Sequence, residues 1–139
     1  MRICQSKRWC DMDLSAVDKS KLYYLASPYS KYPRGQEAAF SDVCKIASFL
    51  VRHKINIFSP IAHSHPIAVH GRMDLMDYKI WLPLDFAISK CCDGLIVAML
   101  QGYDTSFGIN EEIKWFRREK NVEAIFLGVE DILAQGGQR

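Results

Sequence analysis

The chain has 139 residues, of which 49% are hydrophobic and 24% charged, and its formal net charge is +2 at pH 7. This length suits one domain with a real core, and the charge balance provides no basic surface for duplex nucleic acid. No apolar run approaches the ~18 residues that a membrane helix needs, so we expect a small-molecule ligand and no membrane partner.

The N-terminal segment and the cysteines indicate the setting of the domain. Residues 1–20 are polar and lack periodicity, so we interpret them as an extension to a single domain at 21–139, in which Trp9 could dock on the core or on a second subunit. Five cysteines without framework spacing and no apolar leader predict a reducing, cytoplasmic environment. Adjacent Cys91 and Cys92 end a predicted helix and are better interpreted as buried small hydrophobes than as redox or metal groups.

The domain opens with a strand, a loop and a helix. An aromatic-rich strand begins at Lys21 and ends where Ser27 and Pro28 turn the chain, and a helical pattern runs from about Gln36 to His53. The loop between them offers side chains for an aromatic-lined pocket with a cation for a phosphate. These candidates are Ser27, Pro28, Tyr29, Ser30, Lys31 and Arg34. The alternative is a solvated loop that happens to be basic.

A second strand, Ile55 to Ser59, leads into a loop at 60–71 that holds three of the four histidines. His63, His65 and His70 could ligate zinc, but no acidic or thiol partner stands at metal-site spacing. We therefore expect no metal and no other cofactor. Instead, we expect His63 and His65 to line the pocket or to satisfy local backbone groups.

Residues 73–92 predict two helical pieces hinged at Pro83, which suits the first turn of the second piece. Asp85 sits beside a predicted buried stripe. That stripe consists of Leu84, Ala87, Ile88 and Cys91. On this pattern alone, Asp85 is a first-turn acid that complements the helix dipole.

A third strand, Gly94 to Met99, is continuously apolar, as expected for a central parallel strand, and a glycine-punctuated loop follows it. Ser106 and Gly108 lie near the first turn of the next helix, where free N–H groups favour an anion. Helical spacing puts Glu112 on the edge of the buried stripe, while Glu111 points well away. Glu112 is then either a functional carboxylate or a helix-stabilising glutamate of the first turn.

A fourth strand at 122–127 and a short helix at 129–134 complete an alternation of strands and helices. This alternation predicts an α/β domain with a small parallel sheet of four to five strands between two layers of helices. The expected strand order is 2-1-3-4, that of a flavodoxin-like or Rossmann-like three-layer sandwich.

Three separated pieces resemble the nucleoside 2-deoxyribosyltransferase superfamily, over about residues 21–128. The first piece is Tyr24-Leu-Ala-Ser-Pro-Tyr29, which is similar to the opening strand and base-pocket loop of that family. The second is Asp85 followed eight residues later by Asp93 and an apolar strand. The third is Ser106-X-Gly108-X-X-X-Glu112, which resembles the motif that ends in the nucleophilic glutamate. The chain looks closest to a bacterial and phage branch of the superfamily.

The resemblance implies cleavage of an N-glycosidic bond, with Glu112 as nucleophile and Asp85 as the proton donor to the departing base. The helix N-terminus should keep Glu112 ionised, whereas Asp85 needs desolvation or a neighbouring negative charge to hold its proton. Ser106 stands where related nucleoside monophosphate hydrolases carry a serine beside the phosphate, which favours a (deoxy)nucleoside 5′-monophosphate as substrate and hydrolysis as the reaction.

Other functions compete with this expectation. The pocket could bind a nucleotide or an ADP-ribose-like ligand without turnover, or the same carboxylate could cleave a dinucleotide at its nicotinamide ribosyl bond. Family members commonly complete their pockets across a subunit interface, so the resemblance also implies a homo-oligomer.

Overall fold

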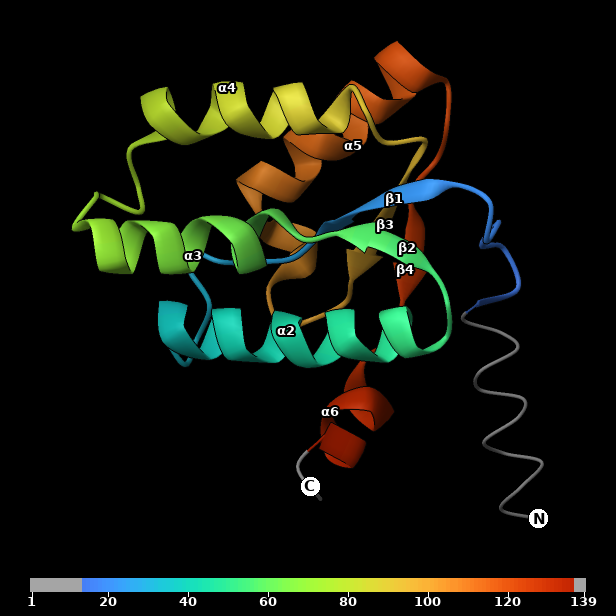
Figure 1. The fold of residues 1–139 in the computed structure, drawn as a ribbon, viewed down its shortest axis with the longest axis horizontal. Helices are drawn as coiled ribbons and strands as arrows, with labels where there is room; N and C mark the ends of the chain where they lie inside the picture. The colour runs from blue at the N-terminus through green and yellow to red at the C-terminus, as the bar shows by residue number, and fades with distance from the viewer. Residues whose placement is uncertain (1–13, 137–139) are drawn as a thin grey trace.

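The computed structural model describes residues 14–136, so Trp9 and most of the predicted N-terminal extension lie outside the described residues. Within this range the chain forms one parallel sheet in the order β2-β1-β3-β4 (Figure 1). Its strands are β1 (Leu22–Ala26), β2 (Asn56–Phe58), β3 (Gly94–Ala98) and β4 (Ile125–Leu127). The predicted strand order and the all-parallel pairing are confirmed.

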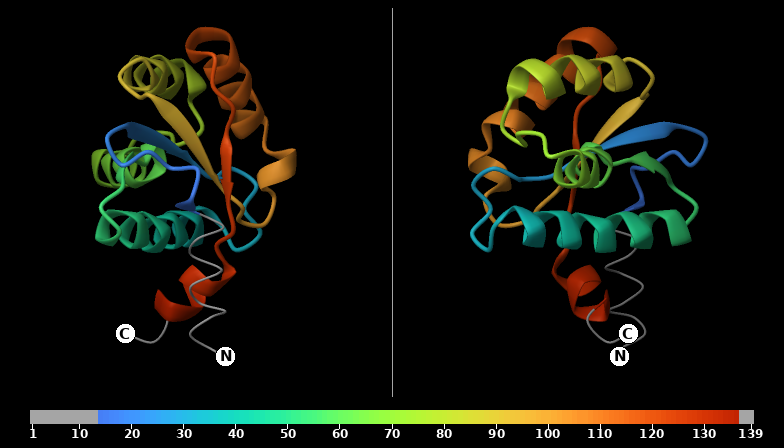
Figure 2. Two further views of the ribbon diagram at one scale, coloured as in Figure 1. Left: turned by 90° about the vertical axis from the view of Figure 1, so that its right-hand side faces the viewer. Right: turned by 60° about the vertical axis from the view of Figure 1, so that its left-hand side comes forward.

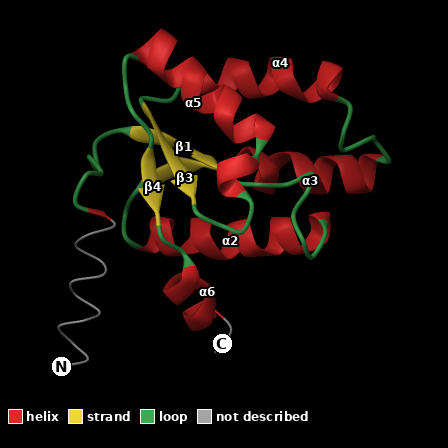
Figure 3. Cartoon of the chain, turned by 180° about the vertical axis from the view of Figure 1, so that it is seen from behind, coloured by secondary structure: helices red, strands yellow, loops and turns green. Residues whose placement is uncertain are grey.

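The two faces of the sheet form two separate cores because successive side chains of a strand point to opposite sides. Tyr23 and Leu25 of β1 pack with α2 (Gln36–Arg52) and α6 (Glu130–Gly136). Tyr24 and Ala26 pack instead with α5 (Phe107–Lys120). Every residue of β3 is buried, as its apolar sequence predicts. Figure 2 shows the strands between these helical layers, and Figure 3 shows the same sheet from behind.

The histidine-rich segment is a helix, α3 (Pro60–Gly71), and our prediction of a loop there was wrong. Ser59 caps the helix, since its hydroxyl accepts a hydrogen bond from the Ala62 amide at 3.1 Å, and Pro60 occupies the first turn. A serine cap followed by proline is a typical helix start. Pro66 inside the segment argued against a helix in the sequence, but it is accommodated in α3. This helix lies between α2 and α4 (Tyr78–Ser89) (Figure 1).

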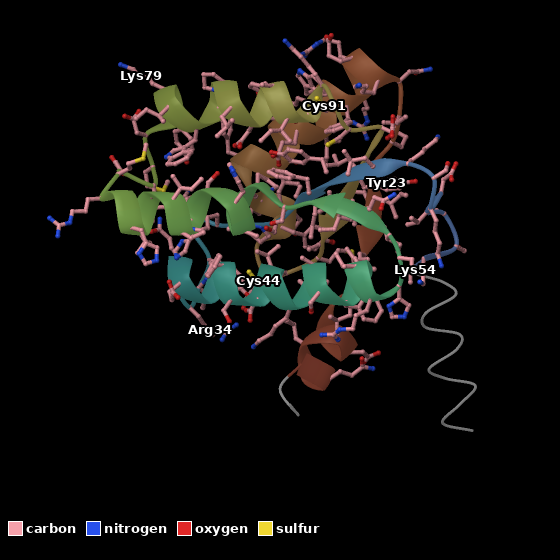
Figure 4. The ribbon with its side chains drawn as sticks, viewed as in Figure 1. Tyr23, Arg34, Cys44, Lys54, Lys79 and Cys91 are labelled. Atoms are coloured by element: carbon pink, nitrogen blue, oxygen red, sulfur yellow. The ribbon has the colours of Figure 1, made fainter. Side chains whose placement is uncertain are left out.

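Helix α4 is continuous, so the predicted hinge at Pro83 was wrong. The predicted buried stripe was also wrong, because Leu84 is 37% exposed and Ala87 and Cys91 are exposed. The helix instead buries Trp81 and Ser89. Asp85, four residues from each, shares that inward face. Cys91 lies beyond the end of α4 (Figure 4) and Cys92 is buried, so only Cys92 fits the predicted role of a buried hydrophobe.

No helix within the described range is long and apolar enough to cross a lipid bilayer.

The amino ends of the two central strands are joined by Asp93. Its carboxylate accepts a hydrogen bond from the Leu22 amide at 2.9 Å, and its own amide donates to the Leu22 carbonyl at 2.7 Å. The next residue, Gly94, lies so close to the Tyr23 ring that an added Cβ would stand 2.7 Å from Tyr23 Cε1. Only glycine fits there without movement of a buried ring.

We predict that Gly94→Ala destabilises the protein by about 1–3 kcal/mol, the usual cost of overpacking a buried site. The measurement is the midpoint of urea unfolding. Gly71→Ala is the matched control, because its new methyl group would meet only Met73 at an ordinary 3.7 Å. Equal midpoints for the two variants would show that the close approach to Tyr23 is not a constraint on the fold.

Candidate active site

A cavity of about 300 Å³ lies where the carboxyl end of β1 meets α3, α4 and the start of α5. Parallel α/β proteins place their ligands at this edge of the sheet. Most of the wall is apolar and aromatic, with Trp81 and Phe86 from α4, Ile61 from α3, and Leu75 and Met76 from the segment between those helices. The apolar and aromatic lining suits a ligand with a largely apolar ring system.

The cavity brings together eight of the candidate residues from the sequence and omits four. Those on the wall are Ser27, Tyr29, Ser30, His65, Asp85, Ser106, Gly108 and Glu112. Pro28 is buried off the wall, whereas Lys31, Arg34 and His63 are exposed outside it. Glu111 also lines the cavity, and its carboxylate pairs with the exposed Lys114 at 3.3 Å.

Arg34 holds the loop after β1 and does not line the cavity. It pairs with the buried carboxylate of Asp42, which also accepts a hydrogen bond from the Tyr32 hydroxyl at 2.7 Å. The guanidinium lies over the Tyr32 ring, 5.7 Å from its centroid. Figure 4 shows Arg34 beside the start of α2. The expectation that Arg34 supplies a cation to the pocket was therefore wrong. Its guanidinium pairs with Asp42 on α2 instead, and the sequence did not reveal that Asp42 is buried.

The two carboxyl groups of the cavity come from neighbouring helices, Asp85 from α4 and Glu112 from α5. Burial raises the pKa of Asp85 to about 6. Part of the Glu112 residue reaches the cavity surface, but protein atoms surround its carboxyl, and this burial raises its pKa to about 8. The nearby Tyr24 hydroxyl lowers the pKa of Glu112 and the charge of Asp85 raises it, both less than burial does.

The prediction that the helix N-terminus keeps Glu112 ionised was therefore wrong. Helix α5 begins at Phe107, so Glu112 is its sixth residue and lies beyond the first turn. The dipole effect falls off within that turn, and the cost of desolvating a carboxylate is larger. Desolvation does favour the protonated form of Asp85, as we expected.

Four buried oxygen atoms on the wall have no hydrogen-bond partner among the described residues: Tyr24 Oη, Ser27 Oγ, Ser64 Oγ and Asp85 Oδ1. The Tyr24 hydroxyl is near Glu112 without forming a hydrogen bond of standard geometry, although its proximity affects the pKa of both groups. Leaving such a group buried and unpaired costs about 1–3 kcal/mol. Their convergence on one cavity indicates that a polar ligand completes them.

Ser106 caps α5 at the edge of the cavity. Its Oγ accepts a hydrogen bond from the Ile109 amide at 3.3 Å, which leaves the hydroxyl proton free to be donated to a ligand. The first amides of α5 point the same way as the positive end of the helix dipole. The two candidate residues at this N-terminus, Ser106 and Gly108, both line the cavity.

Tyr24 and Ser64 are wall residues with unpartnered polar atoms, and the sequence analysis selected neither of them as a site residue. Tyr24 was hidden because an aromatic residue in an apolar strand predicts core, and its ring is indeed fully buried. Ser64 was hidden by the wrong assignment of α3 as a loop. Once residues 60–71 are helical, Ser64 falls one residue before His65 and four after Pro60, and all three lie on the cavity side.

The fold and the cavity together define a small parallel α/β domain whose ligand site combines two buried carboxyl groups with apolar walls. Within this class, the chain belongs to the DUF1937 family, described as a domain of unknown function, whose sequence model matches residues 21–127. The match begins just before β1 and ends with β4, so it includes every residue of the cavity wall. No curated protein matches the chain.

We predict that Glu112→Gln stabilises the fold, increasingly so as the pH rises. The folded-state pKa of about 8 lies above the usual 4.5, so the folded protein takes up a proton between these values. The stability of the wild type is then fully present below about pH 4.5 and decreases as the pH rises through 8. Glutamine removes this loss, which is on the order of a few kcal/mol.

The measurement is the unfolding temperature of both proteins from pH 4 to pH 9. Glu111→Gln is the matched control: its carboxylate is partly exposed and pairs only with Lys114 among the described residues, so the variant should unfold close to the wild type. A wild-type curve that runs parallel to that of Glu112→Gln over the whole range would contradict the buried, proton-binding state of Glu112.

Proposed function

We propose that the protein cleaves the N-glycosidic bond of a nucleoside or nucleoside 5′-monophosphate, by hydrolysis or by base transfer. The observation that carries the proposal is the pair Asp85 and Glu112, two carboxyl groups with raised pKa values in one cavity with apolar and aromatic walls. Such a bond needs a carboxylate at the anomeric carbon and an acid for the departing base. The resemblance to nucleoside 2-deoxyribosyltransferases supports Glu112 as the nucleophile and Asp85 as the acid.

The reaction has two steps. The Glu112 carboxylate forms a bond to the anomeric carbon as the carbon–nitrogen bond breaks, and the electron pair of that bond leaves with the base. The base takes the proton of Asp85. Water or a second base then gives a proton to the Asp85 carboxylate, attacks the same carbon and releases Glu112 as a carboxylate. The Tyr24 hydroxyl, which lowers the pKa of Glu112, and the positive charge that develops on the sugar both favour the ionised nucleophile.

The site offers limited support for a phosphate. Among the described residues, no lysine or arginine lies on the cavity wall, so Ser106 and the first amides of α5 are the groups that would receive a 5′-phosphate. Free nucleosides therefore belong beside monophosphates as candidate substrates.

The alternative, binding without turnover, has one observation in its favour. With a pKa of about 8, Glu112 is mostly protonated near pH 7 in the unliganded cavity and is then a hydrogen-bond donor, not a nucleophile. A cavity of this kind suits a nucleotide sensor.

We predict that the wild type releases free base from at least one member of a panel of nucleosides and 5′-mono- and deoxymonophosphates, detected by chromatography. Glu112→Ala and Asp85→Asn should each reduce the rate at least 100-fold, since each removes a reacting group. Glu111→Gln, on the same wall, is the matched control and should retain most of the rate. Release that persists in Asp85→Asn would remove the acid role. No release from any member, with tight binding retained by Glu112→Ala, would favour the sensor.

A second prediction concerns pH. The reaction needs Glu112 ionised and Asp85 protonated, which is the minor form of the pair because Asp85, with a pKa of about 6, ionises before Glu112, with a pKa of about 8. The share of this form still follows a bell, so kcat/KM should have limbs near pH 6 and pH 8. Below the lower limb both groups are protonated, and above the upper limb both are ionised. A rate that does not change between pH 5 and pH 9 would contradict catalysis by this pair. Mass spectrometry of a trapped sugar adduct identifies the nucleophile independently, and we expect the sugar to be bonded to Glu112.

A further inference from the structure

A chain of three hydrogen-bonded side chains reaches the cavity from elements that hold neither Asp85 nor Glu112. The Tyr29 hydroxyl, in the loop after β1, lies 2.6 Å from His65 Nδ1 on α3. His65 Nε2 in turn lies 2.8 Å from Glu37 Oε2 on α2. Tyr29 and His65 line the cavity, whereas the Glu37 side chain is 81% exposed and the His65 side chain only 5%. The chain therefore runs from solvent to the ligand site.

The direction of the hydrogen bonds follows from what each group can donate. An ionised carboxylate only accepts, so His65 Nε2 carries the proton that bonds Glu37. A neutral imidazole has one N–H, which leaves Nδ1 as an acceptor, and the Tyr29 hydroxyl must then donate to it. Burial, followed by the charge of Glu37, raises the pKa of Tyr29 to about 12, so the hydroxyl keeps its proton for this bond.

The histidine ring cannot easily turn to change this arrangement. Phe40 stacks on it with ring centroids 4.5 Å apart and an interplanar angle of 18°, and Tyr29 meets its edge. The serine hydroxyls of the wall, Ser27 and Ser64, can rotate to donate or accept as a ligand requires. The Tyr29 hydroxyl has its proton committed to His65, so only its lone pairs remain for a ligand in the cavity that Tyr29 lines.

We infer that Tyr29 is a specificity residue that accepts a hydrogen bond from the amino group of a heterocyclic base, and that Glu37 and His65 are positioning residues that hold it as an acceptor. The inference deepens the proposed function and rests on it for the class of ligand. A base that presents a carbonyl oxygen at that point would face the lone pairs of Tyr29 and bind more weakly.

The test measures binding instead of turnover, with Glu112→Gln protein at pH 8. Isothermal titration calorimetry compares adenosine 5′-monophosphate with inosine 5′-monophosphate, and cytidine 5′-monophosphate with uridine 5′-monophosphate. We expect the amino-bearing member of at least one pair to bind about 10-fold more tightly, as one hydrogen bond in a buried site allows. Adding Tyr29→Phe should reduce that ratio to about twofold or less by weakening the amino-bearing ligand.

The positioning role is tested by Glu37→Gln, an exposed site where the change should not affect folding. The amide can donate to His65 Nε2, which moves the ring proton to Nδ1 and turns the Tyr29 proton into the cavity. The preference should then fall at least threefold while overall binding persists, a result that loss of a purely structural contact would not give. Glu123→Gln is the matched control, on an exposed glutamate that pairs with Arg117, and should keep the wild-type ratio.

A ratio unchanged by Tyr29→Phe overturns the inference. The same comparison of adenosine with 2′-deoxyadenosine 5′-monophosphate separates the two sources of a donor: if Tyr29→Phe removes a preference for ribose and not for the amino group, the donor is a sugar hydroxyl and the assignment to the base is wrong. Failure of base release in the wild type refutes the proposed function. The binding ratios do not depend on turnover and still test the role of Tyr29. Absence of binding by every nucleotide refutes both.

Discussion

The desolvation of two carboxyl groups against the sheet is the constraint on which the rest of this site depends. Glu112 and Asp85 lie on two helices, α5 and α4, that both line the cavity, and burial raises the pKa of each. A fold selected for stability alone would replace them with apolar or neutral side chains. The fully buried Tyr24 and the hydroxyls of Ser27 and Ser64 belong to the same arrangement, because their polar atoms have no hydrogen-bond partner in the part of the chain that the structure describes. The chain thus concentrates its unfavourable groups in one cavity.

The sequence predicted the sheet and its strand order because strands and helices alternate along the chain and the central strand β3 is wholly apolar. The wholly apolar residues of β3 can only be a strand covered on both faces, and the alternation of strands with helices leaves few topologies open. The errors came where two local signals disagreed. Pro66 argued against a helix that Ser59 and Pro60 start, and Pro83 suggested a hinge in a helix that continues through it.

The sequence predicted those site residues that the strand topology alone brings together. It did not predict whether a charged side chain faces the cavity or pairs with another residue of the protein. Ser27, Tyr29, Asp85, Ser106 and Glu112 all follow or face the carboxyl ends of the central strands, so their convergence could be foreseen. Arg34 lies in the same loop, but its partner is the buried Asp42, and nothing in the spacing distinguishes that acid from an exposed one. The protonation of Glu112 depends on the three-dimensional packing around its carboxyl, which no linear pattern encodes.

The cluster of Tyr32, Arg34 and Asp42 has a consequence for the cost of recognition. It fixes the segment that carries Tyr29 before any ligand is present. The conformational entropy of ordering that segment is therefore lost when the chain folds and need not be lost again on association. Under the proposed role of Tyr29, a loop held in this way limits the range of ligands that it accepts. Related chains would then change specificity by exchanging the residues between β1 and this cluster, while the cluster itself stays in place.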